Sequence, residues 1–204
     1  MSDIRQALAE INAIRTQVAR DTQFRGYGPA TIAATGVLAL LVAAFQSRAY
    51  GDGSDFLSFL AIWVATAAVS IALTATETIR RARRVHSGLA NEMLQAAVEQ
   101  FLPALIVGVL LTAVMLWTAP RDLWMLPGLW QLLFSLGVFA SCRFLPRQTM
   151  LVGIWYLVAG LTCLVLQSGP KNFSAWSMGI PFGVGQLLVA GVLQYGFEES
   201  SEES

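Results

Sequence analysis

Charged residues are scarce in this chain of 204 residues. Only 13% of the residues are Asp, Glu, Lys or Arg, while 55% are hydrophobic. An average soluble domain carries about 25% charged residues. Because the apolar runs approach the length that crosses a bilayer, we interpret this shortage as typical of a membrane protein. The 13 acidic and 13 basic residues balance, and their placement in a few loops carries more information than their sum.

Cysteine and histidine are also scarce. Cys142 and Cys163 fall in different apolar runs at different expected depths, so no disulfide is expected between them. No CxxC motif or Cys/His cluster with metal-ligand spacing occurs, and the single histidine, His86, cannot supply two axial haem ligands within one chain. We therefore expect no metal site and no cofactor.

Sequence signatures of catalysis are absent. The chain has no nucleophile–base–acid set, phosphate loop, dinucleotide fingerprint or HExxH motif. The inner parts of the apolar runs contain no Asp, Glu, Lys or Arg, which argues against ion- or proton-coupled transport. We expect a protein that is not an enzyme and that has no catalytic residue.

Six apolar runs dominate what is present. A bilayer core about 30 Å thick needs roughly twenty helical residues. The runs therefore predict an all-α, polytopic membrane domain over residues 28–197. The expected transmembrane helices are residues 29–46, 56–76, 101–118, 124–145, 149–167 and 175–197.

The distribution of basic residues predicts the orientation. Most Lys and Arg residues lie in the N-terminal segment, in the polar stretch 77–100 and after the fourth run, whereas the other side holds Arg48, Arg121 and Lys171. The positive-inside rule then places both termini in the cytoplasm of a bacterium, with the six helices in its inner membrane. We expect the first span to act as an uncleaved anchor, and residues 198–204 to form an acidic cytoplasmic tail.

The segment 1–27 has the pattern of an amphipathic helix. Its apolar stripe consists of Ile4, Ile11, Ile14 and Val18, with Ala7 between them. Two interpretations remain open. The stripe can lie on the membrane surface or dock on the protein's own loops, or it can bind a partner helix, including one from a second copy.

Four arginines, Arg80, Arg81, Arg83 and Arg84, mark the stretch 77–100. We expect this stretch to form a helical hairpin that projects into the cytoplasm. The arginines fix the topology and suit anionic lipid headgroups; docking of an acidic partner or a cofactor phosphate is the alternative. Nucleic acid is not an expected partner, because the cluster lacks interleaved aromatic residues.

The last run contains the strongest local irregularity, with Gly179, Pro181, Gly183 and Gln186 close together. Gly179 and Gly183 form a GxxxG face suited to close helix packing. Alternatively, the Gly/Pro segment breaks the helix and gates a binding site. Gln186 needs a hydrogen-bond partner at membrane depth, and the candidates from the sequence are Gln131, Thr66 and Ser70.

Small residues recur at helical spacing in the first two spans. The second span carries an alanine-rich stripe and a row of Ser and Thr residues, and the first span carries a stripe of Thr and Ala residues. We interpret all of them as surfaces for packing on another helix, with the lining of a polar pore as the weaker alternative. The stripes are Ala61, Ala65, Ala68, Ala72 and Thr76; Thr66, Ser70 and Thr74; and Thr31, Thr35, Ala39 and Ala43.

The function expected from these features is non-catalytic. A scaffold, accessory subunit or regulatory membrane protein would contact lipid and a cytoplasmic protein, or a second copy of itself, through the N-terminal helix and the arginine stretch. The alternative is a small transporter or channel for a neutral or weakly polar solute, built around the Gly/Pro segment and Gln186.

Overall fold

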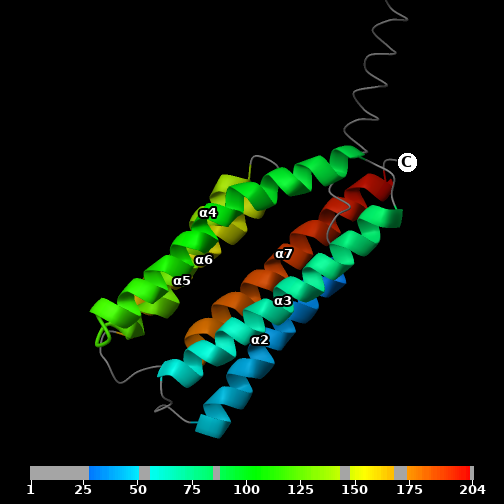
Figure 1. Cartoon of the computed structure of the whole chain (residues 1–204). Coiled ribbons are helices and arrows are strands. Elements are labelled where there is room, and N and C mark those ends of the chain that lie inside the picture. The colour runs from blue at the N-terminus through cyan, green and yellow to red at the C-terminus, as the bar shows by residue number, and fades with distance from the viewer. Residues whose placement is uncertain (1–27, 51–55, 85–87, 143–147, 168–173, 203–204) are drawn as a thin grey trace, which may run out of the picture.

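The computed structural model describes residues 28–50, 56–84, 88–142, 148–167 and 174–202. Within these ranges the chain is helical apart from short turns, and no strand occurs (Figure 1). The elements are α2 (Pro29–Tyr50), α3 (Phe56–Arg84), α4 (Gly88–Thr118), the 3-10 turn η2 (Leu123–Met125), α5 (Leu126–Ser141), α6 (Thr149–Leu166) and α7 (Trp176–Glu202).

Six helices are long and apolar enough to cross a membrane. Their candidate spans are Pro29–Ala49, Phe56–Arg80, Val98–Thr118, Leu123–Ser141, Thr149–Leu166 and Trp176–Gln194. The six-helix, all-α prediction is thereby confirmed, and the architecture suits a multi-pass membrane protein. The predicted helix over residues 1–27 lies outside the described residues. At the other end, α7 continues as a helix into the predicted acidic tail, as far as Glu202.

The helices form two groups of three. One group contains α2, α3 and α7, in which α2 packs on both α3 and α7. The other contains α4, α5 and α6, in which α5 packs on both α4 and α6. The groups lie side by side, with α6 against α7 as the main contact between them (Figure 1).

Small residues bring α2 and α7 into close contact. A Cβ on Gly36 would lie 2.8 Å from the backbone oxygen of Gly183, and a Cβ on Gly179 would collide with the Cβ of Ala43. The side chain of Leu40 covers Gly183. Because small residues allow backbones to approach, dispersion contacts can hold such a pair together in lipid. The small-residue stripe predicted on the first span therefore faces another helix, and that helix is α7.

At one end of the molecule the two groups share an apolar cluster. It is built from the second half of α2, the start of α3, the end of α4, η2 and the adjoining residues of α5 and α7. Its buried members are Ala39, Ala43, Phe56, Phe59, Trp63, Met115, Leu123, Leu126, Ala175 and Met178. We call this set the end cluster. Beyond Trp63, no α3 residue up to Arg80 is buried, so α3 is anchored mainly through its first turns.

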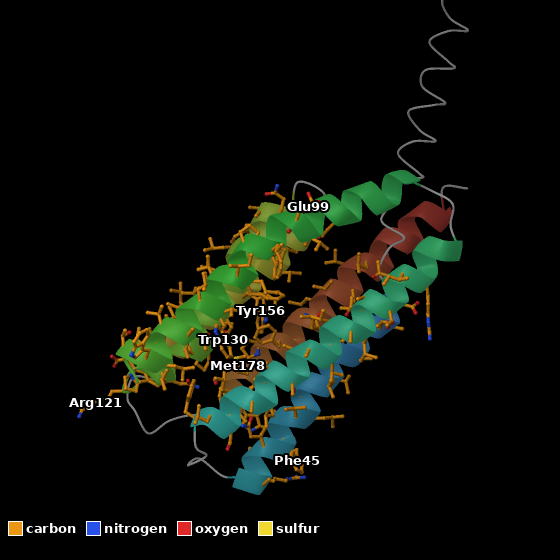
Figure 2. The ribbon with its side chains drawn as sticks, viewed as in Figure 1. Phe45, Glu99, Arg121, Trp130, Tyr156 and Met178 are labelled. Atoms are coloured by element: carbon orange, nitrogen blue, oxygen red, sulfur yellow. The ribbon has the colours of Figure 1, made fainter. Side chains whose placement is uncertain are left out.

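Helix α4 changes direction near Glu99 (Figure 2). Pro103 lies inside this helix, four residues later, and has no N–H to donate to the Glu99 carbonyl. The missing hydrogen bond and the steric bulk of the proline ring explain the bend. The first part of α4 consequently leans across toward the group that contains α3 (Figure 1). Both α3 and α4 extend into the stretch 77–100, and the connection between them at residues 85–87 lies outside the described residues.

Candidate functional site

Aromatic side chains fill the junction between the two groups. Phe134 of α5, Tyr156 of α6 and Phe182 of α7 are mutual neighbours, with ring centroids 4.6 Å (Phe134–Tyr156), 5.4 Å (Phe134–Phe182) and 5.3 Å (Tyr156–Phe182) apart. Phe101 of α4 extends the cluster to Phe134 at 4.9 Å. Tilted and edge-on rings at these distances attract one another beyond simple burial. The junction is thus a packed aromatic centre that draws on four helices.

A polar pair adjoins this aromatic centre. Tyr156 is fully buried, and its hydroxyl lies beside the side chain of Gln186. The contact falls short of the geometry of a hydrogen bond, which leaves the Tyr156 oxygen without a partner. Gly185 makes the approach possible, since a Cβ there would run into the tyrosine ring and hydroxyl. Tyr156 is therefore the neighbour of Gln186, whereas the sequence suggested Gln131, Thr66 or Ser70.

Gln131 instead connects the groups near the end cluster. Its Nε2 donates a 2.7 Å hydrogen bond to the backbone oxygen of Ser177 at the start of α7. Gln131 is fully buried, and its Oε1 has no protein partner. In the same region Trp155 Nε1 donates to the Pro181 carbonyl at 2.9 Å, which joins α6 to α7. These two side chains provide polar contacts between the two groups of helices.

A second buried glutamine ties α3 to α2. Trp63 Nε1 donates to Gln46 Oε1 at 3.0 Å, and both side chains are buried. The Nε2 of Gln46 has no protein partner. A buried polar atom without a partner costs about 1–3 kcal/mol. The stability of this end of the molecule, where the end cluster lies, therefore depends on the few polar atoms of Gln46 and Gln131.

The face of α3 that carries Phe59 and Trp63 becomes polar farther along the helix. Thr66, Ser70, Thr74 and Thr78 continue that face at half-buried positions. Each hydroxyl donates to the carbonyl four residues earlier, at distances of 2.7 to 2.8 Å. Because the hydroxyl hydrogens are used in this way, the oxygen atoms remain available as acceptors. We call these four residues the hydroxyl stripe.

The opposite face of α3 carries the alanine-rich stripe, and it is exposed. Ala61, Ala65, Ala68, Ala72 and Thr76 all lie on this outward face. The expectation that this stripe packs on another helix of the chain is wrong for the described residues. The reason is that α3 directs its aromatic and hydroxyl residues toward the bundle and its smallest residues away from it.

The other predicted site residues are separated from this junction. Arg80 is exposed near the end of α3, and Arg81, Arg83 and Arg84 follow in the same helix, with side chains outside the described part of the structure. The stripe of Ile4, Ile11, Ile14 and Val18 also lies outside the described residues. Helix α7 runs without a break through Pro181, an internal proline that has no N–H to donate to the Ser177 carbonyl. Gly179 and Gly183 face α2, while Gln186 reaches toward Tyr156.

Neither cysteine forms a disulfide, and among the described residues no group of three His, Cys, Asp or Glu side chains could hold a metal ion. Cys142 follows the last residue of α5, and burial raises the pKa of its thiol. A raised pKa keeps the thiol protonated and weakly nucleophilic.

Sequence reasoning missed Tyr156 and Phe134 because neither interrupts its apolar run. A usable signal exists, because a tyrosine in the middle of a span needs a polar neighbour for its hydroxyl group. The comparisons with known proteins add no relative. No family model, curated protein or solved structure matches this chain.

Proposed function

We propose that this protein gives a neutral, hydrogen-bonding solute access to the membrane interior along α3. The hydroxyl stripe supports this proposal. Within one helix, the bundle-facing surface changes from the buried Phe56, Phe59 and Trp63 to half-buried hydroxyls. Contact with lipid does not explain hydroxyl groups on the bundle-facing side of α3, because that side is turned away from lipid. A hydrated path along this side explains them.

The chemistry of the stripe defines the class of solute. Its oxygen atoms act as acceptors, since each hydroxyl hydrogen is bound to the α3 backbone. Between Phe56 and Thr76 the helix contains no ionisable side chain, so nothing there compensates a buried charge. A small neutral molecule with several donors, such as a polyol or an amide, fits these conditions better than an ion does.

Cysteine labelling in membranes tests the hydrated path. In a background where Cys142 and Cys163 are replaced by Ser and Ala, single cysteines are placed at Ser70 or Thr74 and treated with a membrane-impermeant thiol reagent. We expect both to label from the end that carries Arg80. The matched controls are Ala68 and Ala72, at the same depth on the exposed face, and they should stay protected.

Protection of Ser70 and Thr74 from both sides would contradict a hydrated path. Transport itself is measured with proteoliposomes, by following the light-scattering change after an osmotic step of glycerol. We expect faster re-swelling than in empty vesicles, and slower re-swelling for Ser70→Leu, which blocks the stripe with an apolar side chain. Equal rates for loaded and empty vesicles would argue against passage of small polyols.

We also propose that the end carrying Arg80 faces the cytoplasm of a bacterium and that the six helices lie in its inner membrane. The basic residues before residue 29, in the stretch 77–100 and after α5 support this orientation. Reporter fusions at Ser204 and in the loop 119–122 should give opposite results, with the first cytoplasmic. A periplasmic signal at Ser204 would reverse the orientation.

A second candidate function is interaction at this same end. Helices α3 and α4 have 29 and 31 residues, more than a bilayer core requires. Arg80 and Glu99 are exposed there, and Glu99 lies at the bend of α4 (Figure 2). Through the arginines and the N-terminal helix, this end would bind anionic lipid and a cytoplasmic protein, or a second copy of the chain.

Deleting residues 1–25 tests this interaction. We expect the truncated protein to insert normally but to lose any oligomer that light scattering detects for the full chain in mild detergent. Four Arg→Gln changes at the arginine cluster should lower the extra thermal stability that anionic lipid gives over zwitterionic lipid. Unchanged mass and unchanged lipid response together would refute the interaction candidate.

A further inference from the structure

Two helix pairs in this molecule are built around matching prolines. Pro29 begins α2, and Pro127 is the second residue of α5. Their respective partners, α7 and α4, each contain one internal proline, Pro181 and Pro103. Each of these two prolines is the sixth residue of its candidate membrane span. In each pair one helix thus has a proline among its first two residues, and the other has a proline at the sixth residue of its candidate span.

The contacts within the two pairs occur at matching distances from these prolines. Ile32, three residues after Pro29, clusters with Ala190, nine residues after Pro181. The counterparts are Trp130, three residues after Pro127, and Thr112, nine residues after Pro103. Trp130 Nε1 donates to Thr112 Oγ1 at 2.8 Å. The first contact is apolar and the second polar, but both join equivalent positions.

Further along the pairs the same helices remain in contact, while the register shifts first by one residue and then by about one helical turn. Gly36 lies against Gln186, and the equivalent contact is between Leu133 and Gly108. Gln186 and Gly108 each follow their proline by five residues, and Gly36 and Leu133 stand seven and six residues after theirs. At the other end of each pair, Ala43 meets Gly179 and Gly137 meets Phe101. Gly179 and Phe101 both precede their proline by two residues, whereas Ala43 and Gly137 follow theirs by 14 and 10 residues.

We infer that α2–α4 and α5–α7 are two inverted repeats that have exchanged their third helices. Helix α7, the third of the second half, packs on α2, the first of the first half; α4 packs on α5 in return. Each half has three helices, so the second crosses the membrane in the opposite sense to the first. In this architecture Phe101 of the first repeat packs on Phe134 of the second, beside Tyr156 and Phe182. Transporters with inverted repeats hold their substrates at such an interface between repeats.

The two repeats differ in their second helices. Helix α6 is buried along its length on α5, through Val152, Gly153, Tyr156, Gly160 and Cys163. Its counterpart α3 is buried only over its first turns. Equivalent helices of inverted repeats that pack differently correspond to two conformations of one unit. The chain therefore has a second state, in which α3 closes on the bundle and the end cluster opens.

Gln131 holds the present state closed. Its hydrogen bond to Ser177 joins the two groups beside the end cluster, and its free Oε1 is ready to bind water once that cluster opens. Opening therefore breaks one hydrogen bond and hydrates a polar atom that now has no partner. The repeat follows from packing alone, whereas the exchange of accessible ends rests on the proposed hydrated path along α3.

The test measures accessibility at both ends of the molecule. Cysteines at Met178, in the end cluster, and at Ser70, on the hydroxyl stripe, are labelled with an impermeant reagent in two backgrounds, native Gln131 and Gln131→Leu. We expect the leucine variant to label several-fold faster at Met178 and several-fold slower at Ser70. Reciprocal change is required, because a merely loosened protein would label faster at both positions. Ala68 provides the protected control.

Each outcome is decisive. If the labelling rates at Met178 and Ser70 change in opposite directions, the second state is supported. If both rates change in the same direction, or neither changes, and Ser70 is still labelled, the second state is overturned but the hydrated path is not. Failure of Ser70 to label with native Gln131 overturns the proposed path itself. If Gln131→Leu does not fold, a second variant at the same position replaces it. Gln131→Met is used instead, since methionine is close to glutamine in size and cannot donate a hydrogen bond to the Ser177 carbonyl.

Discussion

Helices α3 and α6 are the second helices of their respective halves, and they sit in contrasting environments. Both are apolar and long enough to cross a membrane. Helix α6 presents glycines to α5: a Cβ on Gly160 would lie 2.9 Å from the Gly128 oxygen. Helix α3 turns its alanines outward and contacts the bundle through aromatic residues at one end. Small residues thus create a tight helix pair only where the residues that they meet on the partner helix are also small.

The contrast also separates two uses of hydroxyl groups. Ser135 of α5 donates to the carbonyl of Gly153 on α6 at 2.8 Å, so its hydrogen bond crosses between helices. The hydroxyl of Ser70 donates to Thr66 of its own helix at the same distance. The first use holds two helices together. The second satisfies the hydroxyl hydrogen within α3 and leaves the hydroxyl oxygen as a polar surface on that helix.

The largest expected difference comes from adding the same side chain to both helices. Gly160→Leu places a side chain against the Gly128 backbone, whereas Ala67→Leu adds one at an exposed position of α3. Overpacking costs about 1–3 kcal/mol and occasionally more. We expect Gly160→Leu to lower the unfolding free energy by at least that amount, and Ala67→Leu to leave it within about 0.5 kcal/mol.

Unfolding in mixed micelles, followed by ellipticity as the fraction of sodium dodecyl sulfate rises, measures both variants. A second pair gives an internal check within α7. Gly179→Val meets Ala43, while a Cβ on Gly191 meets nothing within 4 Å. Equal midpoints for Gly179→Val and Gly191→Val would mean that the tight α2–α7 contact does not contribute to stability.

A smaller effect is expected where α3 is anchored. Trp63→Phe keeps an aromatic ring in the end cluster but removes the donor to Gln46 Oε1. Gln46 is buried and already has one unpartnered atom, so a second one should cost about 1–3 kcal/mol. We expect lower stability and faster proteolysis of the segment after Arg84. Gln46→Leu combined with Trp63→Phe should recover part of the loss, because it removes both polar partners.

The sequence was sufficient for the parts of the fold that depend on the bilayer. Six spans follow from hydrophobic length, and the packing of Gly179 and Gly183 follows from their spacing, because both depend on residues near one another in the chain. The partner of each face depends on contacts far apart in sequence. The GxxxG pattern does not say that α2 is the neighbour, and an alanine stripe on α3 looks the same whether it meets a helix or lipid.

The candidate site was predictable only in part for the same reason. Gln186 is conspicuous because an amide is rare at membrane depth, so its need for a neighbour is visible in the sequence. Tyr156 is less conspicuous within an apolar run, and its approach to Gln186 requires Gly185 to lack a side chain. The bend of α4 has a clear local cause in Pro103, but its direction depends on the packing of α5.

The smallest expected effect compares the two serines directly. Ser135→Ala removes a hydrogen bond between helices, which in membrane proteins is worth about 0.6 kcal/mol on average. Ser70→Ala removes a bond within one helix and should change the unfolding free energy by less than that, while it slows passage of glycerol through proteoliposomes. The reverse should hold for Ser135→Ala, with lower stability and unchanged passage. If both serines affected stability alike and neither affected passage, the hydroxyl stripe would be a packing surface, and the distinction between a fixed α6 and a movable α3 would be lost.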